Sequence, residues 1–374
     1  MNKQDIFKSN KIARLATLRH NDYVSSVSWH PDIIRLATSS IDGTAVIWDG
    51  TSGKRIATFS LEKGFFEVVW SPDGSRLATR DRGYVSSGHS KNSKRLFSVR
   101  IWETRSCKEP IILLHDDRID EIAWHPDGDR IATGSDDGTV NIWDTKTGSK
   151  LATLHHRDLV EEVSWSPDGS KLATGSWDNT ARVWNPESGD ELFRIDKYKT
   201  EGGVAWGAVA WSHDGMKIAT ASKNQTIIIW DAREWKRDAI LQAQHNLSLV
   251  KWSPRGNRLL AGVHYTPDTP FPHRTDTKCY LSIWDVEQGL DNAVWKHDGI
   301  MREVVWNPDG KKIAIGLDNG TVYILDARTG TELVCMNHDK QILSMDWTPD
   351  GTRLATGSKD NTAAIWDFSK VKEF

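Results

Sequence analysis

Tryptophan recurs along this chain with a regularity that only a repeat array explains. Of the 374 residues, 19 are tryptophan, and eight of these open a Trp-x-Pro-Asp-Gly-like sequence. The eight copies begin at Trp29, Trp70, Trp124, Trp165, Trp211, Trp252, Trp306 and Trp347. Successive copies lie 41, 54, 41, 46, 41, 54 and 41 residues apart, close to the range of about 20 to 50 residues that marks repeated supersecondary units. The sequence therefore predicts one repeated unit rather than several unrelated domains.

Each copy has the local chemistry of strands joined by tight turns. In the third copy, residues 119–124, 130–135, 139–143 and 150–154 read as strands, and Pro, Asp and Gly residues separate them. Helical periodicity is absent. The third predicted strand ends in a second Trp in seven copies and in Leu325 in the seventh copy, so fifteen tryptophans, eight plus seven, belong to the two series. The chain is therefore predicted to be all-β.

With these two tryptophan series, the chain resembles the WD-repeat β-propeller family over residues 11–368. The resemblance implies an eight-bladed propeller in which each blade is a four-stranded antiparallel sheet. The last copy supplies three strands, so we expect residues 12–18 to complete the last blade and close the ring. Residues 1–10 and 369–374 are then an N-terminal extension and a C-terminal tail, and no second domain is expected.

The family carries a buried hydrogen-bonded tetrad of His, Ser or Thr, Asp and Trp, and four copies match it. The matching residues are His20/Asp42/Trp48, His115/Asp137/Trp143, His156/Asp178/Trp184 and His338/Asp360/Trp366. The hydroxyl would come from Thr38 or Ser40, Thr133 or Ser135, Thr174 or Ser176, and Thr356 or Ser358, and the sequence does not choose between them. The tetrad leaves no buried polar group unpaired, so these histidines are expected to be structural.

The remaining copies depart from this pattern. The residues at the tetrad positions are Leu61 in copy two, Gly202 and Asn224 in copy five, a displaced His245 in copy six, and Asn319 and Leu325 in copy seven. An amide in place of Asp forfeits the charge-assisted part of the hydrogen bond. We expect the blades of copies two, five and six, which lack the histidine or have it displaced, to be held less firmly.

Two copies carry a 13-residue insertion between their second and third strands, in residues 80–97 and 263–280. The family geometry implies that both insertions lie on one rim of the ring. The first is a basic segment with Arg80, Arg82, Lys91, Lys94 and Arg95. The second is rich in Pro and aromatic residues, and its His264, His273, Asp276 and Cys279 match no metal-ligand spacing. No metal or cofactor is expected.

Positions that flank the tetrads bind partners in the family. Carried over copy by copy, they are Tyr23, Ile41, Phe66, Arg118, Asp120, Asp136, Leu159, Glu161, Trp177, Arg302, Asp318, Leu343 and Lys359. Aromatic residues mixed with charges of both signs favour a protein or peptide partner over a sugar or nucleic acid. Trp177 is the foremost candidate, because it lies in a turn beside Asp178 and outside both tryptophan series.

Charge and cysteine content narrow the remaining possibilities. Lys+Arg 48 against Asp+Glu 51 gives a net charge of −3, which argues against a surface built to coat nucleic acid or anionic lipid. Cys107, Cys279 and Cys335 lie far apart, and no apolar stretch is long enough to cross a bilayer. We expect a cytoplasmic protein, with a nuclear location left open, that is a monomer or a subunit of a hetero-complex.

No hydrolase elbow, phosphate-binding loop, zinc-protease motif or dinucleotide fingerprint occurs in the sequence. We therefore expect a non-enzymatic scaffold that binds protein or peptide partners on the face carrying residues 80–97 and 263–280. An alternative is the binding of an acidic or phosphorylated ligand, nucleic acid included, through the basic segment 80–97. A more remote alternative is an enzyme whose site lies in the two inserted segments.

Overall fold

The computed structural model describes residues 12–60, 64–81, 84–85, 95–105, 109–196, 203–243, 247–262 and 278–369. Within these ranges all regular structure is β, with 33 strands in eight sheets and no helix. Neighbouring strands pair antiparallel. The protein is therefore an eight-bladed β-propeller in which each sheet is one blade, as predicted. Blade one is the sheet of the first repeat, and the other blades follow in chain order.

The chain divides into two compact units. The first comprises Met1–Trp70, His264–Tyr280 and Asn292–Phe374, and the second comprises Ser71–Val263 and Leu281–Asp291. Three blades lie in the first unit. Blade one is β2 (Val24–Trp29), β3 (Arg35–Ser40), β4 (Thr44–Asp49) and β5 (Arg55–Ser60). Blade seven is β27 (Met301–Trp306), β28 (Lys312–Leu317), β29 (Thr321–Asp326) and β30 (Glu332–Asn337). Blade eight is β31 (Ile342–Trp347), β32 (Arg353–Ser358), β33 (Thr362–Asp367) and β1 (Ala13–Arg19).

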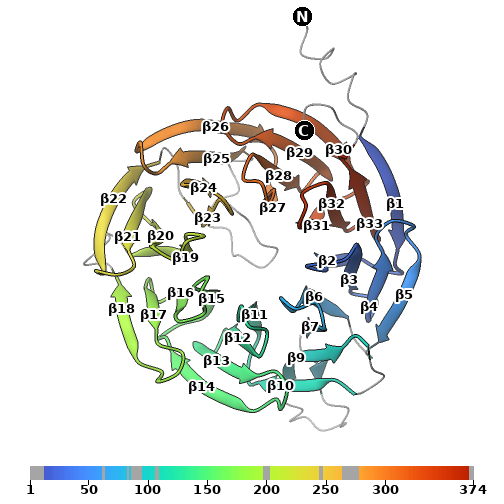
Figure 1. Cartoon of the computed structure of the whole chain (residues 1–374), viewed down its shortest axis with the longest axis horizontal. Helices are drawn as coiled ribbons and strands as arrows, with labels where there is room; N and C mark the ends of the chain where they lie inside the picture. The colour runs from blue at the N-terminus through green and yellow to red at the C-terminus, as the bar shows by residue number, and fades with distance from the viewer. Residues whose placement is uncertain are drawn as a thin grey trace, which may run out of the picture. The chain divides into compact units, whose positions relative to one another are not determined.

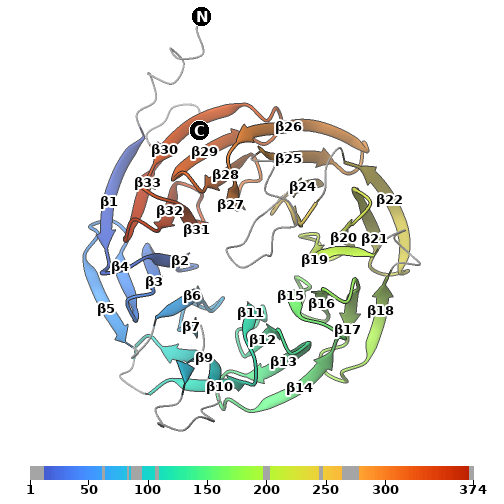
Figure 2. The same ribbon diagram turned by 180° about the vertical axis from the view of Figure 1, so that it is seen from behind.

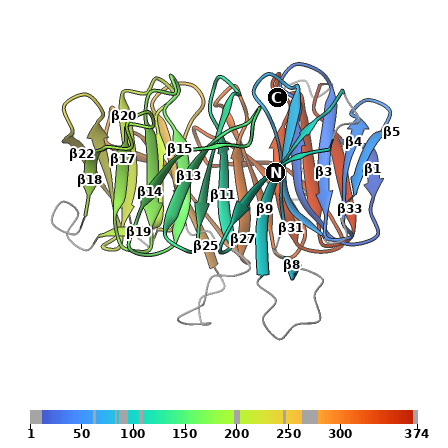
Figure 3. The same ribbon diagram turned by 90° about the horizontal axis from the view of Figure 1, so that it is seen from below.

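Three further blades lie in the second unit. Blade three is β11 (Ile119–Trp124), β12 (Arg130–Ser135), β13 (Thr139–Asp144) and β14 (Lys150–His155). Blade four is β15 (Val160–Trp165), β16 (Leu172–Ser176), β17 (Ala181–Trp184) and β18 (Glu191–Ile195). Blade five is β19 (Val204–Trp211), β20 (Lys217–Ser222), β21 (Thr226–Asp231) and β22 (Lys236–Gln242). Figure 3 shows β13 and β14 side by side, and the four strands predicted in the third repeat are confirmed to within one residue.

The two blades that carry the insertions complete the set. Blade two is β6 (Phe65–Trp70), β7 (Arg76–Asp81), β9 (Arg95–Glu103) and β10 (Ile111–His115), and the two-residue strand β8 (Tyr84–Val85) also pairs with β9. Blade six is β23 (Leu249–Trp252), β24 (Arg258–Gly262), β25 (Lys278–Asp285) and β26 (Leu290–Asp298).

The N-terminal strand completes the last blade, as predicted. Strand β1 lies beside β33 (Figure 1), and Figure 2 shows the same pair from behind. Thr17 is opposite Ala364 and Leu18 is opposite Ala363. Leu18 is the one fully buried side chain of β1, so backbone pairing supplies most of the attachment.

A threonine provides the tetrad hydroxyl in each of the four matching blades. The second-series indoles donate to it over 2.7 to 2.9 Å, in the pairs Trp48–Thr38, Trp143–Thr133, Trp184–Thr174 and Trp366–Thr356. The histidine Nε2 lies 2.7 to 2.8 Å from the same oxygen. In blades four and eight, His156 and His338 also place Nδ1 3.2 and 2.8 Å from Asp178 and Asp360. The serines two residues later are not part of the tetrad.

Blade three departs from the predicted tetrad at its aspartate. Asp137 is exposed and accepts hydrogen bonds from the backbone and hydroxyl of Thr139. No hydrogen bond or ion pair between Asp137 and His115 occurs in the described chain, and His115 Nδ1 instead lies 3.4 Å from the Asn141 amide nitrogen. Asn141 stands where blades one, four and eight have Val46, Arg182 and Ala364, and this amide occupies the place at Nδ1.

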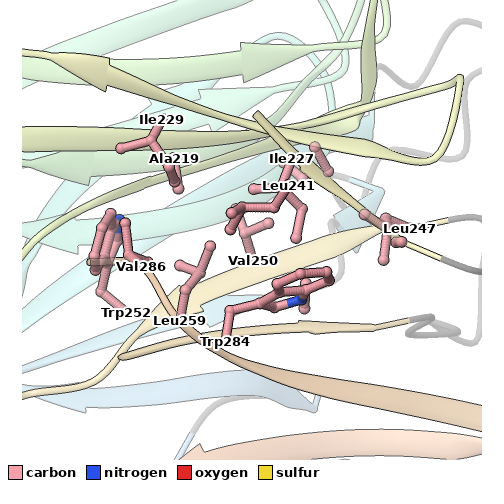
Figure 4. Packing of buried hydrophobic residues seen from close by; sticks show 14 residues of the cluster. Ala219, Ile227, Ile229, Leu241, Leu247, Val250, Trp252, Leu259, Trp284 and Val286 are labelled. Atoms are coloured by element: carbon pink, nitrogen blue, oxygen red, sulfur yellow. The ribbon is translucent and has the colours of Figure 1, made fainter. Parts of the chain in front are cut away.

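Blades six and seven show what happens when the threonine is lost. In blade six Ala261 takes its place, and the indole N–H of the buried Trp284 has no acceptor among the described residues. Figure 4 shows Trp284 among the apolar side chains of this cluster. In blade seven, by contrast, Ile315 replaces the threonine and Leu325 replaces the tryptophan. The paired apolar replacement leaves no buried donor unsatisfied at this position.

The first tryptophan series joins neighbouring blades, a role that sequence reasoning did not assign to it. In five blades the indole N–H donates to the backbone carbonyl that precedes the tryptophan of the blade before it, whereas the buried indole N–H of Trp347 has no acceptor among the described residues. The five pairs are Trp29–Asp346, Trp70–Ser28, Trp165–Ala123, Trp211–Ser164 and Trp252–Ala210, with distances of 3.0 to 3.2 Å. The Asp346 carboxylate also accepts the Trp29 backbone N–H at 2.6 Å, and burial raises the pKa of Asp346 to about 7.

The orphaned Trp284 indole gives a direct test of the tetrad. We expect Ala261→Thr to raise the free energy of unfolding by about 1 kcal/mol, because the new hydroxyl accepts the buried N–H. Ala261→Val is the matched control, since it has the same shape without an acceptor. Urea denaturation measures both, and equal effects of Thr and Val would contradict the assignment.

His115 should weaken the fold in acid. Burial lowers the pKa of His115 to about 4, against the opposing charge of Asp137. The unfolded chain therefore takes up this proton near pH 6.5 and the native state does not, so stability falls as pH drops from about 6.5 to about 4, by about 3 kcal/mol at most. His115→Asn should flatten this part of the pH–stability curve.

Candidate functional site

Four of the predicted partner-binding residues occupy one structural position in their blades. Asp120, Glu161, Arg302 and Leu343 are each the extra residue of a β-bulge in the first strand. In β11 the pairing passes from Ile119–Ser135 to Glu121–Gly134 and skips Asp120. A bulge leaves its extra residue unpaired and re-aims the side chain. The repeated bulge, which was not predicted from the sequence, is therefore the local structure that presents these residues.

Arg118 links two carboxylates of blade three. The Asp136 backbone N–H donates to the Arg118 carbonyl over 2.8 Å, which places Asp136 beside the start of β11. The Arg118 guanidinium then lies 2.7 Å from Asp120 Oδ1 through Nη2 and 3.2 Å from Asp136 Oδ2 through Nε. The Asp120 side chain is 15% exposed and that of Arg118 is 38% exposed, so the cluster is partly shielded from water.

The two aspartates also act on each other. Asp120 Oδ2 and Asp136 Oδ1 are buried and have no N–H or O–H donor within the described part of the chain. Burial, followed by the hydrogen-bonded contact with Asp136, raises the pKa of Asp120 to about 8, although Arg118 and Arg80 attract its charged form. The Asp120 carboxyl is therefore largely protonated at neutral pH.

Blade four adds an acid and an indole to this cluster. The Trp177 indole N–H donates to Glu161 Oε2. Burial raises the pKa of Glu161, while this hydrogen bond and the Arg118 charge oppose the rise. Strands β11 and β15 are in contact. We call these five residues, Arg118, Asp120, Asp136, Glu161 and Trp177, the Trp177 surface.

Trp177 is half-buried rather than fully exposed. Its backbone N–H donates to the Leu159 carbonyl over 3.0 Å, and its indole is held by Glu161. The half-buried Leu159, itself a predicted partner-binding residue, thus positions Trp177 through its main chain. Trp177 is thus held at its main chain and at its indole N–H, which lowers the entropy cost of using the ring in a contact.

The predicted residues of the first unit form two smaller groups. Lys359 Nζ lies 5.8 Å from the centre of the Tyr23 ring, which is 39% exposed. In blade seven, burial lowers the pKa of Arg302, and the charge of Asp318 opposes this. Asp318 also accepts the backbone N–H of Ile300 at 3.0 Å. Phe66 lies in β6, but its side chain is outside the described structure.

Arg80 does not belong to an exposed basic segment. It lies in β7, is buried, and donates to the carbonyl of Ile119. The strand continues to Asp81, whose carboxylate is 2.9 Å from Arg100. The first insertion therefore begins later than predicted. Arg82, Lys91 and Lys94 lie outside the described residues, and Arg95 begins β9 with its side chain outside them as well.

Most of the second insertion, including His264, His273 and Asp276, also lies outside the described residues. Cys279 is buried in β25, and burial raises the pKa of its thiol to about 11. The described residues contain no group of three or more His, Cys, Asp or Glu side chains placed to hold a metal ion. In the same residues, no helix has the length and apolar character needed to cross a membrane.

Family comparison agrees with the tryptophan pattern. The model described as WD domain, G-beta repeat matches residues 13–49, 109–144, 148–185, 199–231 and 330–367. A second model, the anaphase-promoting complex subunit 4 WD40 domain, matches residues 273–338. The chain belongs to the WD-repeat β-propeller family.

Individual relatives cover smaller parts of the chain. The guanine nucleotide-binding protein subunit beta of Zea mays is 37% identical over 137 residues, which is 34% of this chain and 33% of the relative. The protein of the same name from Oryza sativa subsp. japonica is 36% identical over 137 residues, with the same coverage. The chain thus spans about a third of the length of these curated relatives.

A solved structure supports the fold over nearly the whole chain. The crystal structure of the computationally designed Ika8 protein superposes with a TM-score of 0.74, covering 95% of this chain and 99% of that one. Sequence identity is 17%, so the likeness concerns the fold alone.

The Trp177–Glu161 hydrogen bond should contribute measurably to stability. We expect Trp177→Phe to lower the free energy of unfolding by about 1 to 2 kcal/mol, because a half-buried carboxyl loses its indole donor. A double-mutant cycle with Glu161→Ala should give a coupling of about the same size. Additive effects of the two changes in urea denaturation would show that the bond is not formed.

Proposed function

We propose that the protein is a non-enzymatic scaffold that binds protein or peptide partners through the Trp177 surface. The observation that carries this proposal is the gathering of predicted partner-binding residues from two neighbouring blades. Arg118, Asp120 and Asp136 come from blade three, and Glu161 and Trp177 come from blade four. A contact surface built from separate repeats is what a rigid propeller can offer to a partner.

The chemistry of this surface suits a protein partner. Trp and Arg are the side chains that most often dominate the binding energy of protein interfaces. Trp177 and Arg118 are both partly accessible, and each is held in place by a carboxylate. Ordered anchors lose little side-chain entropy on binding. The surface therefore combines an aromatic anchor with charges of both signs.

The comparisons support a role in assembly. The relatives from Zea mays and Oryza sativa are named as subunits of a guanine nucleotide-binding protein, so those proteins are components of larger assemblies. We extend the assembly role to this chain as a subunit of a hetero-complex or as a monomer that recruits partners. We also propose that the inserted segments 80–97 and 263–280 are further contact regions on the same face. We propose a cytoplasmic location as well, which imaging of a tagged chain tests.

The experiment is a comparative capture followed by affinity measurement. We expect proteins that bind the wild-type chain to be lost with Trp177→Ala and retained with Leu151→Ala, which also truncates a large apolar side chain, at an exposed position on β14. For a partner identified in this way, Trp177→Ala should weaken binding by about 2 kcal/mol, or roughly thirtyfold. Calorimetry with purified partner measures the loss.

Two results would contradict the proposal. Equal affinity of the wild-type and Trp177→Ala chains would remove the Trp177 surface from the interface. Binding that falls steeply with salt and depends on Arg82, Lys91, Lys94 and Arg95 would instead favour an acidic or phosphorylated ligand at the basic segment.

A further inference from the structure

Each carboxyl group of the Asp120–Asp136 pair has one oxygen that receives no hydrogen bond from the described residues. Arg118 occupies Asp120 Oδ1 and Asp136 Oδ2. The remaining oxygens, Asp120 Oδ2 and Asp136 Oδ1, are buried, and the described residues supply no donor to either. The two side chains are partly buried, and two carboxylates in contact repel each other unless one of them carries a proton. A single proton between these oxygens gives both of them a partner.

The surrounding charges come from several elements and do not replace that proton. Arg118, at the start of β11, lies between the two carboxylates. Arg80, from β7, attracts the charged form of Asp120, but its hydrogen bond is to the Ile119 carbonyl. From β15, Glu161 adds a third acid, and its carboxylate accepts the Trp177 indole N–H. Asp136 and Arg118 both influence Glu161, so the acids of the two blades are coupled.

We propose that Asp120 and Asp136 share one proton near neutral pH and act as a pH-sensitive switch for the Trp177 surface. While the proton is present, the two carboxyl groups are joined and Arg118 bridges their outer oxygens. When the proton leaves to solvent, both groups are negative and repel each other across the same guanidinium. The charge of the Trp177 surface then becomes more negative by one unit. The change lies at the two carboxylates that Arg118 bridges, and Asp136 is electrostatically coupled to Glu161.

The switch has a predictable effect on binding. A partner that places an ammonium or guanidinium group at this pair is attracted more strongly once the proton has left, so its affinity rises with pH. A partner that places a carboxylate there shows the opposite dependence. Only this biological role rests on the proposed function, because the shared proton is a property of the isolated chain.

Infrared titration of the full chain tests the proton directly. The C=O stretching band of protonated carboxyl groups is followed from about pH 5.5 to about pH 9.5, where ordinary Asp and Glu side chains are already ionised. We expect the band that the wild type loses to include one step near pH 7 for Asp346 and one near pH 8 for the pair. Asp120→Asn should abolish the upper step, because its amide N–H replaces the shared proton toward Asp136.

Two variants serve as controls. Asp346→Asn should remove the lower step and keep the upper one. Asp136→Asn should shift the upper step downward, because Asp120 then loses the neighbouring carboxyl group, and this variant also tests the pair if Asp120→Asn does not fold. An upper step that persists in Asp120→Asn, or that is missing from Asp346→Asn, would overturn the inference.

Stability gives a second readout with a defined sign. The pKa of Asp120 is raised in the native state, so the unfolded chain loses this proton first and wild-type stability declines as pH rises from about 4 to about 8. Within that window, the native-to-unfolded ratio of the wild type should fall relative to Asp120→Asn by up to about tenfold per pH unit. Parallel curves for the two chains would contradict the switch. Neither readout needs a partner, so the switch and the proposed function can fail independently.

Discussion

Hydrogen bonds of buried indole N–H groups organise this protein at two levels. Inside a blade, the second-series indole donates to a threonine, as Trp143 does to Thr133. Between blades, the first-series indole donates to a backbone carbonyl of the blade before it, as Trp165 does to Ala123. A buried donor without an acceptor costs about 1 to 3 kcal/mol. The positions of the acceptors therefore constrain the strand register inside the blades and, in the five pairs that form the second kind of bond, the packing of one blade on its neighbour.

The same constraint explains the irregular blades. Blade seven lacks the donor and the acceptor together, with Leu325 and Ile315 in their places, and its core stays apolar. The hydroxyl of Tyr323 in β29 lies 2.9 Å from Nε2 of His297, which is in β26 of blade six. Blade six lacks the acceptor alone and leaves Trp284 unsatisfied. When the donor and the acceptor are both replaced by apolar residues, no buried polar group is left unpaired. When the acceptor alone is replaced, a buried N–H loses its partner, and this lowers stability.

The Trp177 surface is made of residues that belong neither to the tetrads nor to the indole bonds between blades. The first-strand bulge removes Asp120 and Glu161 from the pairing pattern and turns their side chains away from the sheet ladder. Both carboxyl groups have raised pKa values because they are substantially buried. Burying acids in this way works against stability, and clusters with that character are frequent at functional sites. The rigid blades tolerate the cost and hold Trp177 in a fixed position.

The amino-acid sequence by itself determined the blade number, the strands of the third repeat, the N-terminal strand in the last blade and the Trp-centred tetrads. The blade number and the strands of the third repeat follow from residue spacing, whereas the closing strand and the tetrads follow from the resemblance to the WD-repeat family. The sequence also nominated Arg118, Asp120, Glu161 and Trp177 one by one. It could not show that they meet, that Asp137 leaves His115, that Arg80 is buried, or which hydroxyl the indoles choose. Those outcomes depend on distances between side chains from different strands and blades, and such distances exist only once the sheets have twisted, bulged and packed against one another.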